Sequence, residues 1–149
     1  MRAVAIMFVV LGACSVPAGE PEAIVERDVA AFATDVQPLL KAGCASLDCH
    51  GTAGRPLRLY AEYGLRERVE LRTQPVSADE LTANVAAFAG ISVDVILGKP
   101  LHTSAGGMKH VGGDLWSSKD SPEYVCVAAW LNGTSAPSAC AAAVDAAPY

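Results

Sequence analysis

The segment Cys44–His50 places two thiols, with four residues between them, directly before an imidazole. This feature constrains the fold most, because a chain of 149 residues with three Phe, two Trp and four Tyr has few large side chains for a core. Small cores of this kind usually need a disulfide, a metal or a bound group to hold them together. Five Cys and three His are the material that the sequence offers for such a role.

Three chemistries fit the cysteine-rich segment. Cys44 and Cys49 could form a small disulfide beside a surface histidine, or they could join His50 and a later histidine around a zinc ion. The third is a c-type haem, which is attached by two thioethers and bound at iron by the histidine after the second cysteine. Haem motifs usually have two residues between the thiols, and the two extra residues here could loop outward without moving Cys49 and His50.

The first residues indicate export. One base at Arg2 precedes the apolar run Ala3–Leu11, which is shorter than the roughly 20 residues of a membrane-spanning helix. Leu11-Gly12-Ala13-Cys14 resembles the lipobox of bacterial lipoproteins. That resemblance implies a signal peptide over 1–13, a lipid on Cys14 and a place on the periplasmic side of the membrane, with the outer membrane favoured by Ser15. Secretion of a free soluble protein is the alternative, and both routes lead to a compartment where disulfides persist.

Charge and motifs exclude several functions. A formal net charge of −5 argues against nucleic-acid binding, which depends on excess positive charge. The sequence has no G-x-S-x-G elbow and no phosphate-binding loop, so we do not expect an enzyme. Five of the eleven bases lie within 55–73, interleaved with acids, either as a solvated face or as a positive rim around an anionic group or partner. These bases are Arg55, Arg58, Arg66, Arg68 and Arg72, and the acids are Glu62, Glu67 and Glu70. Arg66 and Arg68 are the positions expected to face a redox partner.

Local patterns predict a mainly helical domain. Pro and Gly near its start make residues 14–33 a tether, and Thr34 is expected to cap a helix over 35–43. Ser77 and Glu80 form a capping-box pattern before a helix over 78–90. Residues 93–97 could be a short strand or a helical turn.

The second half is predicted to be a long loop followed by one helix. Residues 98–119 hold five glycines, and loops of that length are usually functional. Ser121 is expected to cap a helix over 121–132 that stops at Asn132-Gly133. The domain is expected to end at Cys140, leaving 141–149 as a loosely held tail.

Several segments resemble the class I cytochrome c domains abundant in planctomycetes and myxobacteria. At the start these are Phe32–Cys44 and Cys49–Gly51, and at the end Leu97–Leu101, Gly106–Gly113, Trp116, Ser118, Asp120, Glu123-Tyr124 and Trp130–Gly133. The resemblance covers both ends of a domain over 34–140, with a poorly matching middle and a departure in the cysteine spacing. It implies a small all-α fold of three to five helices around one covalently attached haem c.

The same resemblance assigns roles to individual residues. Cys44 and Cys49 would hold the haem, His50 would be the proximal iron ligand, and His110 the distal one. Met108 is the main alternative to His110, followed by His102 or an open position. The implied function is one-electron transfer by a lipid-anchored monohaem cytochrome that meets redox partner proteins.

With Cys14, Cys44 and Cys49 assigned in this way, Cys126 and Cys140 remain and are expected to form a disulfide. Two other functions stay open. The chain could be a cofactor-free, disulfide-stapled surface lipoprotein that serves as a binding or structural module, or a haem sensor for a diatomic gas.

Overall fold

A computed structural model describes residues 27–64, 66, 69–71 and 73–147. Over these ranges the protein is helical and has no strands, so the all-α prediction is confirmed at the level of fold class. The proposed signal peptide over 1–13, the lipidation site Cys14 and residues 14–26 of the tether lie outside them. None of the helices in the described ranges has the length and apolar character to cross a bilayer.

The first helical stretch begins earlier than predicted. It runs without a break through α1 (Val29–Ala31), the π-helical η1 (Phe32–Val36) and α2 (Gln37–Gly43). Its cap is Asp28, whose carboxylate accepts hydrogen bonds from two backbone amides of the first turn. Thr34 was predicted to be the cap, but it lies inside the helix, where its hydroxyl bonds back to the carbonyl of Ala30.

The predicted boundary between a tether ending at residue 33 and a domain beginning at residue 34 is wrong. Phe32 is fully buried, with its ring centre 4.8 Å from that of Trp130 and 6.1 Å from that of Phe88. The Trp130 indole also donates to the carbonyl of Asp28. Aromatic packing of this kind orders the chain from residue 28 onward, so residues 28–33 belong to the domain.

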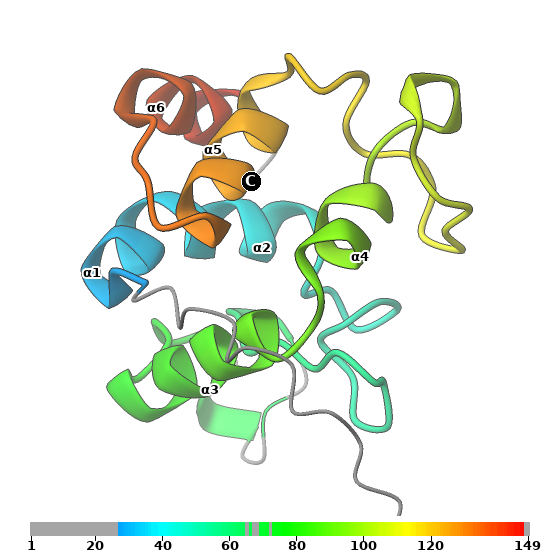
Figure 1. Ribbon diagram of the computed structural model, residues 1–149. Coiled ribbons are helices and arrows are strands. Elements are labelled where there is room, and N and C mark those ends of the chain that lie inside the picture. Colours follow the sequence, from blue (N-terminus) through cyan, green and yellow to red (C-terminus); the bar gives the residue numbers. More distant parts are fainter. Residues whose placement is uncertain (1–26, 65, 67–68, 72, 148–149) are drawn as a thin grey trace, which may run out of the picture.

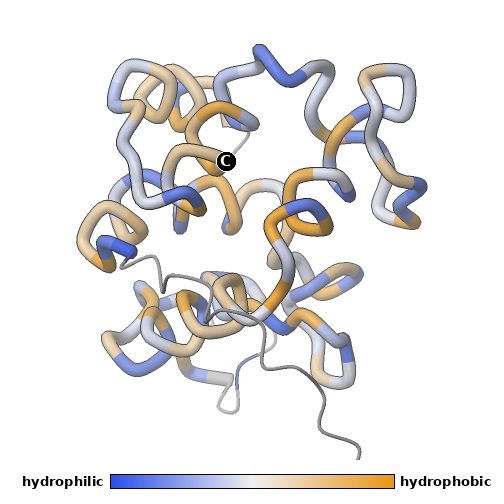
Figure 2. The backbone as a smooth tube through the Cα atoms, in the orientation of Figure 1, coloured by the Kyte–Doolittle hydropathy of each residue, from blue (hydrophilic) through white to orange (hydrophobic). Residues whose placement is uncertain are grey.

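Two later helices pack against the N-terminal stretch. In Figure 1, α5 (Pro122–Leu131) and α6 (Pro137–Ala146) lie side by side above it, and α3 (Ala78–Ala89) lies on its other side. Cys126 and Cys140 form the predicted disulfide between α5 and α6, a link worth about 3 kcal/mol for a loop of this length. Apolar residues are prominent along α5 in the hydropathy view (Figure 2).

The C-terminal tail was also predicted wrongly. Residues 141–146 continue α6, and Ala143 is fully buried. Alanine is the best helix former, and the disulfide at Cys140 holds this helix against α5. At the start of α5, Ser121 stands at the cap position, but its hydroxyl donates to the carbonyl of Ser118 instead of accepting from the helix.

The middle of the chain follows its local signals. The Ser77–Glu80 capping box is present at the start of α3, as predicted. Residues 93–97, which the sequence left undecided, are helical and belong to the short helix α4 (Val93–Gly98). The glycine-rich region 98–119 is a loop with one short helical turn, η3 (Thr103–Ala105), and a single bridge between Leu101 and Trp116.

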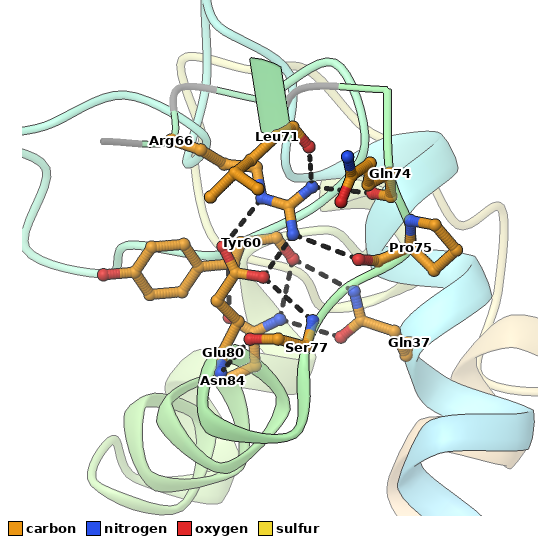
Figure 3. Close-up of polar contacts among 9 residues, drawn as sticks. All are labelled: Gln37, Tyr60, Arg66, Leu71, Gln74, Pro75, Ser77, Glu80 and Asn84. Carbon is orange, nitrogen blue, oxygen red and sulfur yellow. Dashed lines mark hydrogen bonds and ion pairs between the residues drawn. The ribbon is translucent and has the colours of Figure 1, made fainter. Parts of the chain in front are cut away.

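Arg66 is the structural anchor of the least regular region (Figure 3). It is only 3 % exposed, and its guanidinium is paired with the Glu80 carboxylate, with 2.7 Å between Arg66 Nε and Glu80 Oε1. The same group donates to three backbone carbonyls around η2 (Val69–Leu71), those of Leu71, Gln74 and Pro75. Arg66 therefore cannot face a redox partner, which corrects the prediction, and Arg68 lies outside the described residues.

A second buried network fixes residue 60 between two helices (Figure 3). The side-chain amide of Asn84, fully buried in α3, donates to the carbonyl of Tyr60 at 2.7 Å and to Gln37 of α2 at 2.8 Å. Its oxygen accepts from the amide of Tyr60 at 2.7 Å. Since every polar group of Asn84 is paired, the segment leading to Tyr60 has one defined position.

Candidate functional site

An apolar pocket brings together the two ends of the domain. One wall contains Cys44, Cys49 and His50, and the opposite wall contains His110 from the glycine-rich loop. Apolar residues from α2, α3, α4 and the intervening segments enclose the space between these walls. They include Leu40, Leu57, Phe88, Ile91, Val95, Ile96, Pro100, Leu115 and Trp116.

The segment between the two cysteines folds into a compact turn. The amide of His50 donates to the carbonyl of Cys44 at 2.9 Å, so the chain returns close to its starting point. Ala45 is buried, while Ser46, Leu47 and Asp48 are exposed, which fits the expectation that extra residues loop outward. Gly51 is required after His50, because a Cβ there would lie 2.0 Å from the carbonyl oxygen of Ala45.

The His50 ring is held by a backbone carbonyl. Its Nδ1 lies 2.9 Å from the carbonyl oxygen of Leu57 and must donate, because a carbonyl only accepts. The proton is thereby fixed on Nδ1, and Nε2 keeps its lone pair for a metal. The sequence did not predict that the Leu57 carbonyl would hold this ring, because every residue has a backbone carbonyl and no residue type marks the one that will be used.

Both pocket cysteines are free thiols in the structure, whereas Cys126 and Cys140 are bonded. Burial, and then the neighbouring Cys49, raise the pKa of Cys44 to about 12. Cys44 therefore stays protonated near neutral pH while no metal is bound. Within the described ranges, no group of three or more His, Cys, Asp or Glu side chains is arranged to hold a metal ion.

His110 lies opposite His50. The two ring centres are 6.1 Å apart, and the ring planes are inclined by only 8°. His110 Nδ1 is 3.3 Å from the carbonyl oxygen of Gly113, a weaker contact than the one that holds His50. A Cβ at Gly112 would lie 3.0 Å from the His110 ring, so glycine gives this ring its room.

The two alternative distal ligands do not line the pocket. The side chain of Met108 is 39 % exposed and lies over Gly98, where an added Cβ would be 3.1 Å from its Cγ. His102 is exposed, with Nδ1 at 2.7 Å from Ser104 Oγ and Nε2 at 3.5 Å from an Asp114 carboxylate oxygen. Of the three candidates, the structure brings only His110 to face His50.

The basic residues near the pocket differ in their availability. Arg55 donates to the carbonyl of Asp48. Arg58, next to the pocket residue Leu57, packs its guanidinium over the Tyr60 ring at 4.8 Å. Its buried Nε has no hydrogen-bond partner among the described residues, which leaves a donor for an anionic group.

Comparisons of the chain with models of protein families, with curated proteins and with solved structures found no match.

Proposed function

We propose that this protein binds one haem c in the pocket and transfers single electrons. The observation that carries the proposal is the pair of nearly parallel rings of His50 and His110, 6.1 Å apart across an apolar space. Two metal–nitrogen bonds of about 2 Å each, plus about 1 Å from each nitrogen to its ring centre, give about 6 Å. The distance between the ring centres matches this sum, and coordination also requires both Nε2 atoms to turn toward the space between the rings.

The remaining walls suit a porphyrin better than a bare metal ion. The pocket is lined mainly by apolar side chains, and its two unpaired thiols, Cys44 and Cys49, are on the same wall as His50. A buried macrocycle would also supply the large apolar body that a chain with nine aromatic residues lacks. Thioether attachment requires both thiols to be free, and a Cys44–Cys49 disulfide would prevent it.

Each nearby residue has a definable task. When bound, the haem supplies an iron that changes its charge by one electron. The Leu57 carbonyl orients the His50 ring, and the apolar walls exclude water from the metal. Arg58 follows the pocket residue Leu57, and its unpaired buried donor makes it a candidate to bind a haem carboxylate.

The N-terminal pattern completes the proposal. A lipid on Cys14 would tether the domain to the periplasmic side of a bacterial membrane, where redox partner proteins exchange electrons with it. A periplasmic location also agrees with the disulfide between Cys126 and Cys140, because disulfides persist in oxidising compartments.

Distal-ligand variants test this assignment. In His110→Ala the ferric protein is expected to change from low spin to high spin, and the ferrous protein should bind carbon monoxide rapidly, because one of two strong ligands is gone. Met108→Ala, the matched control from the same loop, should keep the native spectrum. A near-infrared methionine–iron band that is present in the native protein and lost in Met108→Ala would overturn the choice of His110.

A further inference from the structure

The loop that carries His110 is bound to the end of α4 by two successive residues. The amide of Met108 donates to the carbonyl of Gly98 at 2.7 Å. The Lys99 ammonium donates to the carbonyl of Lys109 at 3.0 Å. Residues 98 and 99 thus hold residues 108 and 109, directly before the histidine.

Lys99 is also a pocket residue. It is half-buried and lines the same apolar space as His110. The aliphatic part of the Lys99 side chain lines the apolar wall, while its ammonium reaches the Lys109 carbonyl at the exposed surface.

Without this contact, His110 would be weakly held. Among the described residues, the His110 ring has one hydrogen-bonding contact, the 3.3 Å approach to the carbonyl oxygen of Gly113, and glycines flank it at 106–107 and 112–113. Gly106 and Gly113 have φ of +91° and +86°, a backbone conformation that glycine adopts readily. By contrast, His50 lies in a turn closed by its own amide and bonds to Leu57 at 2.9 Å.

We propose that Lys99 is a positioning residue for His110. By donating to the Lys109 carbonyl, its ammonium fixes the peptide group before His110 and limits the exchange of this histidine for an external ligand. The inference rests on the proposed function in treating His110 as a ligand. The contact itself belongs to the polypeptide and can be tested without haem.

The first test is carbon monoxide binding to the full-length, haem-loaded ferrous protein. Lys99→Met keeps the length of the side chain and removes the donor. Carbon monoxide should then replace His110 a few-fold faster, the change expected for one solvent-exposed charge-assisted hydrogen bond. The thermal midpoint should change little, since the side chain is only half-buried.

Two variants separate the hydrogen bond from the charge. Lys109→Met removes one positive charge beside His110 but keeps the backbone carbonyl that Lys99 contacts, so its rate should remain native. Lys99→Arg retains a cationic donor and should restore most of the native rate. Equal rates in Lys99→Met and the native protein, or equal acceleration in Lys109→Met, would overturn the proposal.

The second test is hydrogen–deuterium exchange over 107–113, which needs no haem. Amides in this segment should exchange faster in Lys99→Met than in the native protein or Lys109→Met, because the contact to α4 is lost. Unchanged exchange would refute the positioning role. If the native chain carried no haem, the proposed function would fail, and the exchange data would still decide whether Lys99 holds the loop.

Discussion

Glu80→Gln is expected to lower the free energy of unfolding by about 3 kcal/mol at neutral pH, because it leaves the Arg66 guanidinium buried without its counter-charge. Arg66 is 3 % exposed and would keep as acceptors the carbonyls of Leu71, Gln74 and Pro75 and one neutral amide oxygen in place of the carboxylate. Glutamine has nearly the shape of glutamate, so packing is preserved and the loss reports mainly the charge. Urea denaturation at pH 7 measures it.

The same pair makes stability depend on acid. The hydrogen bond from Arg66, helped by Ser77 and opposed by burial, lowers the pKa of Glu80 from 4.5 to about 2. A lowered carboxyl pKa stabilises the folded state above the unfolded pKa, and this contribution falls as pH drops from about 4.5 towards 2. A difference of this size corresponds to about 3 kcal/mol. Glu80→Gln should therefore lose less stability over this range than the native protein does.

Asp79→Asn is the matched control, since it removes an exposed carboxylate from the same first turn of α3. We expect an effect of no more than about 1 kcal/mol from the weaker helix-dipole interaction. If Glu80→Gln were no more destabilising than Asp79→Asn, the pair would not anchor the region. A double-mutant cycle with Arg66→Met would separate the pair energy from the cost of an isolated charge.

The second large effect concerns the pocket thiols. Replacing both Cys44 and Cys49 with serine should reduce covalently bound haem from about one per chain to none, because a hydroxyl does not form the thioether that holds a c-type haem. Mass spectrometry of the denatured protein, expressed with the haem-attachment machinery, measures this directly.

The other two cysteines provide the control. Cys126→Ser with Cys140→Ser removes the α5–α6 disulfide, so we expect about 3 kcal/mol less stability but unchanged haem attachment. Haem that stayed covalently bound after loss of Cys44 and Cys49 would contradict the assignment of these thiols.

Local chemistry made part of the fold predictable. The Ser77–Glu80 capping box and the glycine-rich loop at 98–119 follow from short-range signals, and the structure has both. Elements that depend on distant contacts were missed. The start of the first helical stretch, from its cap Asp28 to Phe32, is held by Trp130, about a hundred residues away, and α6 is held by its disulfide to α5.

The burial of Arg66 also depends on contacts between residues that are not neighbours in the sequence, and it could not be predicted from the sequence. In a sequence it is one base of five in 55–73, and such clusters are usually solvated. Its burial depends on three carbonyls and on Glu80, which converge only in the folded chain (Figure 3).

The candidate site also has a part that the sequence predicts and a part that only the structure shows. The cysteines and His50 form a contiguous motif, so their proximity is fixed by the sequence, whereas the choice of His110 over Met108 came from a resemblance. The structure adds the facing rings of His50 and His110. The contacts that hold the two histidines in place use backbone carbonyls, that of Leu57 for the His50 ring and that of Lys109 for the Lys99 ammonium. No residue pattern predicts such contacts.

The most direct test of the central claim is a reduced-minus-oxidised pyridine haemochrome spectrum, combined with intact mass, of the native protein made in cells with c-type haem attachment machinery. We expect a c-type band and a mass gain of about one haem that survives acid–acetone extraction. A protein without Soret absorption, with Cys44 and Cys49 joined in a disulfide, would contradict the proposal and support a cofactor-free binding or structural module.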